Sequence, residues 1–196
     1  ADNSLLLITR DDIIARMVGE YPKLMSGMDG GWWMGESYNK PGRSTQYGIV
    51  NVESGNSLNR EASANIRNTL ISQYQVPTYY VSNNCERDYH FMDPNSLLIT
   101  SAEHLYSTLA NASFVVTTRA HSTICCLTNG TQVKYIGEGS NRVKGLMETV
   151  GIDITDPSAL EDTRGCYDKV VAAKAKFIED VKVRLKLPEP KSQGAE

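Results

Sequence analysis

Arg119 and His121, two side chains that bind anions and move protons, lie two positions apart in the segment Phe114-Val-Val-Thr-Thr-Arg-Ala-His-Ser-Thr-Ile124. This segment passes from an apolar strand pattern into a helix pattern, so both side chains are expected at a strand-to-helix junction. The first turn of a helix offers unpaired N–H groups and a partial positive charge. Together with a guanidinium and an imidazole it would bind phosphate or carboxylate. A buried Arg–Asp pair with a helix-capping histidine explains the same spacing equally well.

The elements that must position this junction alternate between strand and helix from Tyr47 onward. Short apolar runs predict strands over residues 47–52, 77–81, 97–99, 113–118 and 132–136. Helix patterns cover residues 60–74, 101–111, 122–129, 143–150 and 167–187. This alternation predicts an α/β fold, with a mostly parallel sheet and helices on both faces. Ligands bind such sheets outside the carboxyl ends of the strands, which makes residues 119–123 the first candidate site.

The first 43 residues have a different pattern. Residues 5–9 favour a strand, and residues 11–18 favour a helix with acidic residues in its first turn. Residues 26–43 are rich in glycine and predict a loop or linker. We therefore expect 1–43 to be the tail end of an N-terminal domain plus a linker, 44–190 to be the α/β domain, and 191–196 to be a polar tail.

Composition is ordinary for a soluble globular protein, with 40% apolar and 22% charged residues among 196. The formal charge of −3 gives no reason to expect a nucleic-acid partner. The four cysteines fit no zinc spacing, so no metal site is expected, and a Cys85–Cys166 pair is left open. No apolar run reaches the ~18 residues of a membrane span. The glycine-rich segment 27–35 does not match a dinucleotide-binding or Walker motif.

Several short motifs follow one another along the chain in a characteristic order. Thr117-Thr-Arg-Ala-His-Ser122 is followed by an apolar helix, Gly130, the strand Val133-Lys-Tyr-Ile136 and Asn141-Arg-Val-Lys-Gly-Leu-Met147. This order resembles the carboxyl-terminal signature of polysaccharide pyruvyltransferases. The Thr9-Arg-Asp11 helix start, with Asp29 further on, is similar to the end of that family's first domain. The chain departs from the family at Ala120, where a larger apolar residue is usual, and at Gly30-Gly31, where proline follows the aspartate.

The resemblance implies a GT-B-like architecture, in which this chain supplies the Rossmann-like carboxyl-terminal domain. The implied reaction moves a pyruvyl group from phosphoenolpyruvate, as co-substrate and without a further cofactor, onto sugar hydroxyls to form a ketal. The implied catalytic residues are His121 and Arg119. The implied substrate-binding residues are Arg10, Ser122, Lys144, Asp29 and Asp93.

Several of these residues also have a purely structural interpretation. Lys144 fits a solvated helix lysine, and Asp29 fits a turn ahead of two glycines. Trp32 and Trp33 would stack on a sugar or pack at a domain junction equally well.

Two other functions stay open. One is a GT-B glycosyltransferase that uses a nucleotide-sugar and grips its ribose through Glu148 or Asp153. The other is a non-catalytic module that binds anions or carbohydrate. The expected partners are phosphoenolpyruvate and a saccharide acceptor, and this chain on its own is expected to bind the donor without necessarily turning it over. The expected compartment is the cytoplasm, or the Golgi lumen if a preceding segment carries an anchor.

Overall fold

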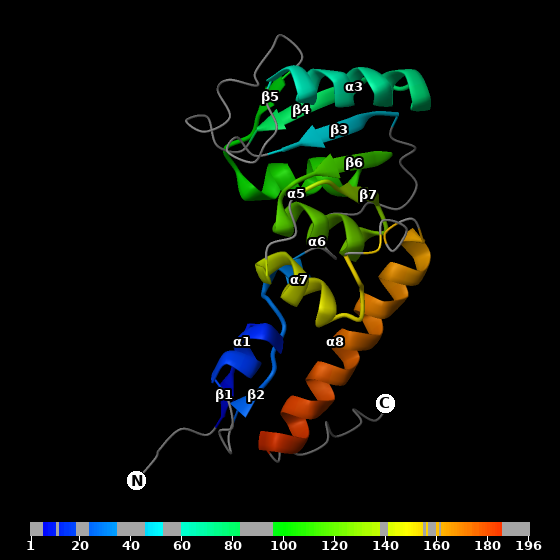
Figure 1. Cartoon of the computed structure of the whole chain (residues 1–196). Coiled ribbons are helices and arrows are strands. Elements are labelled where there is room, and N and C mark those ends of the chain that lie inside the picture. Colours follow the sequence, from blue (N-terminus) through cyan, green and yellow to red (C-terminus); the bar gives the residue numbers. More distant parts are fainter. Residues whose placement is uncertain are drawn as a thin grey trace, which may run out of the picture.

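The computed structural model describes residues 6–10, 12–18, 24–34, 46–52, 60–82, 96–137, 141–154, 156, 160 and 162–185. The molecule is elongated, with a five-stranded sheet at one end and a two-stranded sheet at the other (Figure 1). The long helix α8 (Thr163–Leu185) runs along the molecule between these two ends. No helix in the described part of the chain combines the length and apolarity that a bilayer crossing requires.

The large sheet contains β3 (Gly48–Asn51), β4 (Thr78–Ser82), β5 (Ser96–Leu98), β6 (Phe114–Thr117) and β7 (Gln132–Tyr135). Its order is β5-β4-β3-β6-β7, and every neighbouring pair is parallel. The chain builds outward from β3 to β5, then crosses back and builds outward again from β6. The order therefore reverses between β3 and β6, and such a reversal is where open parallel sheets bind ligands. The predicted parallel α/β fold is confirmed.

Helices cover both faces of this sheet. Helix α3 (Arg60–Tyr74) packs on β3 and β4, whereas α5 (Ala102–Ala110) and α6 (Ala120–Asn129) pack together on the other face. Successive strand residues point to opposite faces. In β6, Val115 accordingly joins the core under α6, and Val116 joins the smaller core under α3. Strands buried on both faces need continuous apolar runs, which is the pattern that the sequence shows.

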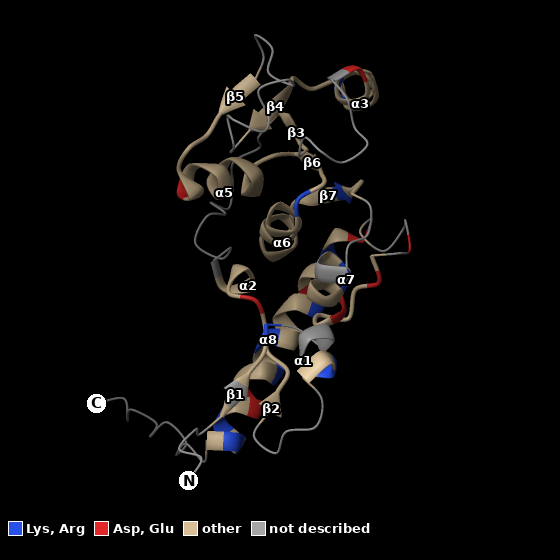
Figure 2. Ribbon diagram, turned by 60° about the vertical axis from the view of Figure 1, so that its left-hand side comes forward, with Lys and Arg blue, Asp and Glu red and all other residues tan. Residues whose placement is uncertain are grey.

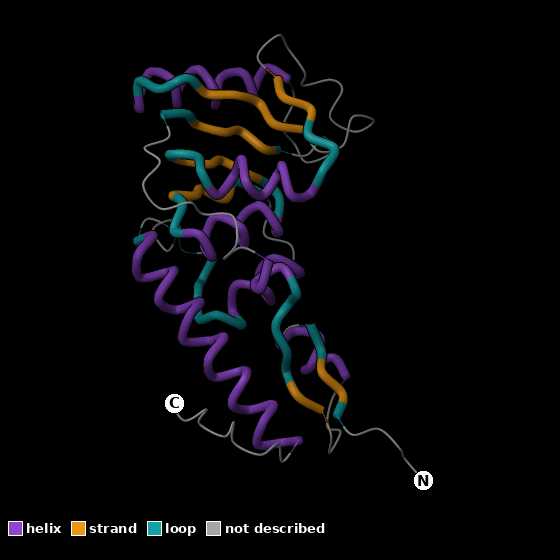
Figure 3. Tube along the Cα trace, turned by 180° about the vertical axis from the view of Figure 1, so that it is seen from behind, coloured by secondary structure: helices purple, strands orange, loops and turns teal. Residues whose placement is uncertain are grey.

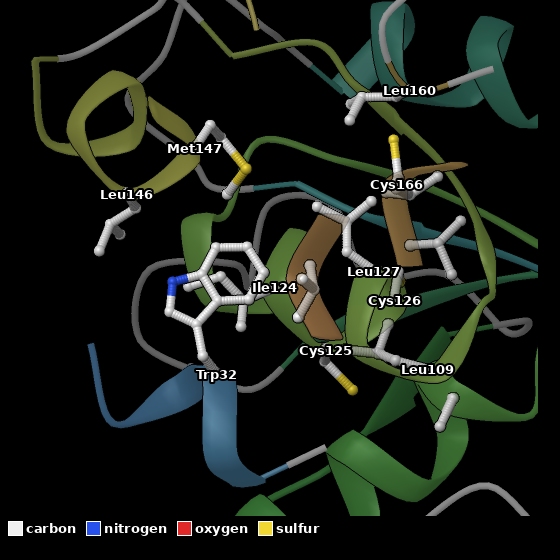
Figure 4. Close-up of a cluster of buried hydrophobic side chains, with 14 of the residues drawn as sticks. Trp32, Leu109, Ile124, Cys125, Cys126, Leu127, Leu146, Met147, Leu160 and Cys166 are labelled. Atoms are coloured by element: carbon white, nitrogen blue, oxygen red, sulfur yellow. The ribbon is translucent and has the colours of Figure 1, made fainter. Parts of the chain in front are cut away.

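The larger core gathers side chains from segments far apart in sequence (Figure 4). Trp32 of α2 (Gly31–Met34) lies against Ile124 of α6, and Met147 of α7 (Asn141–Glu148) lies beside them. Cys166 at the start of α8 closes the far side of the cluster. This packing attaches the first residues of the chain to the α6 side of the sheet.

The amino-terminal residues form a small βαβ unit. Strands β1 (Leu7–Ile8) and β2 (Leu24–Met25) pair in parallel, and α1 (Asp12–Val18) connects them. This unit lies beside the carboxyl-terminal part of α8 (Figure 3), where Arg184 Nη1 donates to the Leu24 carbonyl at 3.2 Å. An ion pair of 3.0 Å between Arg16 and Glu148 joins α1 to α7.

Three predicted boundaries need correction. The loop expected over 26–43 contains helix α2, which Asp29 begins by accepting a hydrogen bond from Gly31 N–H at 2.8 Å. Helix α6 begins at Ala120, two residues before the predicted start, so His121 lies within its first turn. Helix α8 begins at Thr163 and not at Tyr167, because Asp162 accepts a hydrogen bond from Gly165 N–H at 2.8 Å and caps the earlier turn.

We predict that Gly48→Ala destabilises the protein by about 1–3 kcal/mol, the usual cost of overpacking. Gly48 lies directly opposite Phe114, and a Cβ at Gly48 would overlap the Phe114 ring. Alanine is otherwise better than glycine in a strand, so a loss of stability reports the overlap. Urea unfolding measures it. In a Phe114→Ala background the same change should cost nothing, and an additive penalty in the double variant would contradict the explanation.

The core cysteines are predicted to resist alkylation in the folded protein. Cys125, Cys126 and Cys166 carry free thiols, while Cys85 lies outside the described residues. Burial raises the pKa of Cys125 to about 12 and raises that of Cys126 as well. At pH 8 the reactive thiolate of Cys125 is then about one molecule in ten thousand. Peptide mass spectrometry after iodoacetamide treatment should find Cys125 and Cys126 unlabelled until urea is added. Rapid labelling of the folded protein would refute their burial.

Candidate functional site

Polar side chains join the two central strands at the point where the strand order reverses. Asn51 ends β3 and Thr117 ends β6, and the two residues are paired in register. Thr117 Oγ1 donates to the Asn51 carbonyl at 2.6 Å, and Asn51 Nδ2 donates to the Val81 carbonyl of β4 at 2.8 Å. These bonds fix the carboxyl ends of three neighbouring strands relative to one another.

The same network holds the first turn of α6. Ser122 is buried, and its hydroxyl donates to Asn51 Oδ1 at 2.6 Å. Ser122 was expected to bind substrate, and the structure places its side chain in this buried network, beneath the exposed end of the helix. The helix start is therefore set by the sheet and does not move independently of it.

Arg119 occupies the N-cap position of α6 in an extended conformation, with φ −100° and ψ 128°. Its backbone N–H donates to Thr117 Oγ1 at 3.0 Å, and its carbonyl accepts from the Thr123 hydroxyl at 3.0 Å. The side chain makes no capping bond, and its Nε atom is buried although the residue is half-exposed. The backbone of Arg119 is thus fixed on both sides of the strand-to-helix junction.

Asp29 brings together two of the predicted site residues. Its Oδ1 lies 3.3 Å from His121 Nε2, and its Oδ2 lies 3.8 Å from Arg10 Nε. Asp29 is buried with 8% of its surface exposed, whereas the His121 side chain keeps 40%. A carboxylate with little water around it is stabilised by these positively polarised neighbours.

Helix α2 holds Asp29 in place against α6, and Figure 2 shows the two helices side by side. Trp32 is completely buried between them, which anchors the turn that follows Asp29. Gly31 permits the close approach, because a Cβ there would lie 3.0 Å from His121 Cδ2. Packing at the junction, one of the two interpretations of Trp32, is what the structure shows.

The remaining predicted contacts lie elsewhere or outside the description. Lys144 is on α7, where its Nζ lies 3.7 Å from Glu148 Oε1, and it is not among the residues gathered around Asp29. Glu148, an acidic residue considered for a ribose, pairs with Arg16 as well as Lys144. Asp153 is exposed, and Asp93 lies outside the described residues.

Sequence reasoning missed Asn51 and Gly31. A signal existed for Asn51, because a polar residue ends the apolar run Gly48-Ile-Val-Asn51 just as Thr117 ends Phe114-Val-Val-Thr117. No local signal marks Gly31, because its role depends on a helix about 90 residues away along the chain.

A separate cavity of about 310 Å³ lies on the other face of the sheet, between α3 and the strands β6 and β7. Tyr74, Phe114, Val116, Lys134 and Tyr135 are among its lining residues. It is therefore distinct from the Asp29–His121 cluster, which opens to solvent through the imidazole.

Residues 45–140 match the family model of polysaccharide pyruvyl transferase. No curated protein sequence matches the chain. Among solved structures, the glycotransferase of kitacinnamycin is similar with a TM-score of 0.40 and 14% identity, covering 77% of this chain and 45% of that one. The calicheamicin glycosyltransferase CalG4 has a TM-score of 0.44 and 13% identity, covering 96% and 54%. The chain thus spans about half the length of these two proteins.

The matched residues include all five strands of the large sheet together with helix α6 and the junction at Arg119 and His121. The match rests on the sequence of this sheet and spans just under half of the chain, so residues 45–140 are similar to a domain of the polysaccharide pyruvyl transferase family.

Proposed function

We propose that the protein transfers the pyruvyl group of phosphoenolpyruvate to hydroxyls of a saccharide, with a ketal as product. The observation that supports this most is the meeting of Arg10 and His121 at Asp29, beside the fixed Arg119 backbone. Phosphoenolpyruvate carries a carboxylate and a phosphate on a small frame. Two guanidiniums, an imidazole and a helix N-terminus are the groups that recognise such a molecule.

Arg119 is the proposed ligand of a donor anion. A guanidinium fork binds a carboxylate or phosphate through two parallel hydrogen bonds, and the N-terminus of α6 adds its partial positive charge nearby. Arg10 would supply a second guanidinium from the amino-terminal segment. Lys144 and Asp93 remain lower-ranked proposals, since Lys144 would have to leave Glu148 to reach a donor.

His121 is the proposed proton donor. Protonation of the methylene carbon of phosphoenolpyruvate converts it to a methyl group and leaves the adjacent carbon electron-poor. One sugar hydroxyl adds to that carbon and releases its proton, phosphate then departs with the C–O bonding pair, and a second hydroxyl completes the ketal. Fixed cations stabilise the charge that develops on the departing phosphate.

The amino-terminal unit is proposed to belong to a second domain in a GT-B-like arrangement. A two-stranded parallel sheet is too small to be stable alone, so β1 and β2 suit the edge of a larger sheet. On this proposal residues 1–43 are the end of that domain with its linker, and residues 44–190 form the donor-binding domain. The saccharide would lie between the two.

We predict that Arg119→Ala and His121→Ala each lower turnover with phosphoenolpyruvate by roughly 100-fold or more. The assay follows phosphate release in the presence of a saccharide acceptor. Arg164→Ala is the matched control, since Arg164 is 82% exposed and pairs with Asp168 on α8. Near-normal turnover in either site variant would refute its role.

Donor identity is tested by thermal unfolding of the chain with added ligands. Phosphoenolpyruvate should raise the melting temperature of the wild type and of Arg164→Ala, but not of Arg119→Ala. Stabilisation by nucleotide-sugars in its place would favour a glycosyltransferase. If phosphoenolpyruvate binds but is not turned over with any of the saccharides tested, a non-catalytic binding module would be favoured.

A further inference from the structure

One edge of the His121 ring is turned toward the amino-terminal segment. The Nε2 atom faces Asp29 Oδ1 at 3.3 Å, and Cδ2, its neighbour in the ring, is the atom that a Cβ at Gly31 would meet. The opposite edge of the ring carries Nδ1 and Cε1. Asp29 and Gly31 therefore occupy one side of the imidazole, and Nδ1 is left on the other.

This orientation determines which nitrogen holds the proton of the neutral ring. An ionised carboxylate only accepts hydrogen bonds, so a neutral histidine beside it must carry its hydrogen on Nε2. The lone pair then lies on Nδ1. When the ring is protonated, Nε2–H stays on Asp29 and the Nδ1 proton is the one available for transfer.

Asp29 is poorly suited to touch the donor directly. Its Oδ1 accepts from Gly31 N–H at 2.8 Å and faces His121, while its Oδ2 faces Arg10. Its carboxylate would also repel a donor with two anionic groups. A contribution through His121 agrees with these contacts better than the direct substrate contact implied by the family resemblance.

We propose that Asp29 is a positioning residue for His121. It holds the Nε2–H tautomer and the ring orientation, so that Nδ1 is the nitrogen that exchanges a proton with the substrate. Asp29 lies in the amino-terminal segment and His121 lies on α6. The proton transfer proposed for His121 therefore depends on a residue of the amino-terminal segment. The catalytic part of this inference rests on the proposed function; the tautomer does not.

The direct test is ¹⁵N NMR of the histidine side chains, without any ligand, in wild type and in Asp29→Ala. His121→Gln identifies the signals that belong to His121. Alanine removes the carboxylate that faces Nε2, so Nε2–H loses its acceptor and the ring also populates the Nδ1–H tautomer. It also removes the bond from Gly31 N–H to Asp29 Oδ1, which is expected to lower the free energy of unfolding.

The expected result is Nε2–H in the wild type and a gain of Nδ1–H in Asp29→Ala. An Nδ1–H tautomer in the wild type, or an unchanged tautomer in the variant, would overturn the proposal. Unfolding by urea checks that the variant retains its fold.

Kinetics separate positioning from direct binding. Asp29→Ala should lower kcat by roughly 100-fold, as loss of a well-placed proton donor does, with little change in KM for phosphoenolpyruvate. A large rise in KM with kcat preserved would instead mark Asp29 as a donor ligand. Failure of the wild type to use phosphoenolpyruvate would refute the proposed function but leave the NMR result standing.

Two adjacent glycines supply a matched pair of variants. A Cβ at Gly31 would lie 3.0 Å from His121 Cδ2 and 3.1 Å from Asp29 Oδ1, whereas a Cβ at Gly30 meets nothing within 4 Å. Gly31→Ala should therefore shift the His121 NMR signals and lower kcat, and Gly30→Ala should match the wild type. Wild-type signals and kcat in Gly31→Ala would contradict the proposed seating of the ring.

Discussion

The hydrogen bonds around Asn51 are the constraint on which the site depends. The Asn51 side chain accepts from the Ser122 hydroxyl of α6 and donates to the Val81 carbonyl of β4, while the Asn51 backbone carbonyl accepts from Thr117 of β6. All of these groups are buried, where an unpaired polar atom would cost about 1–3 kcal/mol. The junction that carries Arg119 and His121 is therefore registered to the sheet, and the backbone has little freedom there.

A second constraint comes from the opposite side of α6. Trp32 is buried against Ile124, and Gly31 brings the backbone of α2 next to the imidazole of His121. Asp29 thereby reaches His121 across a sequence separation of 92 residues. The packing of Trp32 and the placement of the buried Asp29 carboxylate occur together, because Asp29 lies just before the short helix that carries Trp32. The electrostatic environment of His121 is consequently set by a segment outside the sheet.

The sequence predicted the sheet well for a simple reason. Strands buried on both faces, such as Phe114–Thr117, need unbroken apolar runs, and the helices between them show their own periodicity. The position of Arg119 and His121 after such a strand leaves an anion site and a structural pair equally open, and the family resemblance favours the anion site. Its placement at the reversal between β3 and β6 follows from strand order, which local patterns do not encode.

The parts that sequence reasoning missed depend on long-range contacts. Glycines at 27, 30 and 31 predict a loop, yet a buried tryptophan and a capping aspartate make a helix there. Lys144, which the resemblance implied as a donor contact, pairs with Glu148 one turn along the same helix, and its role in donor binding stays a prediction. The pairing of Asp29 with both Arg10 and His121 needed the two segments to be brought together, and no periodicity reports that.

The most direct measurement is a crystal structure of the protein with bound phosphoenolpyruvate. We predict a donor anion within hydrogen-bond distance of the Arg119 guanidinium. We also predict that the methylene carbon lies on the Nδ1 side of His121, with Asp29 still on Nε2. A donor bound away from α6, or one that meets His121 at Nε2 with Asp29 displaced, would contradict it.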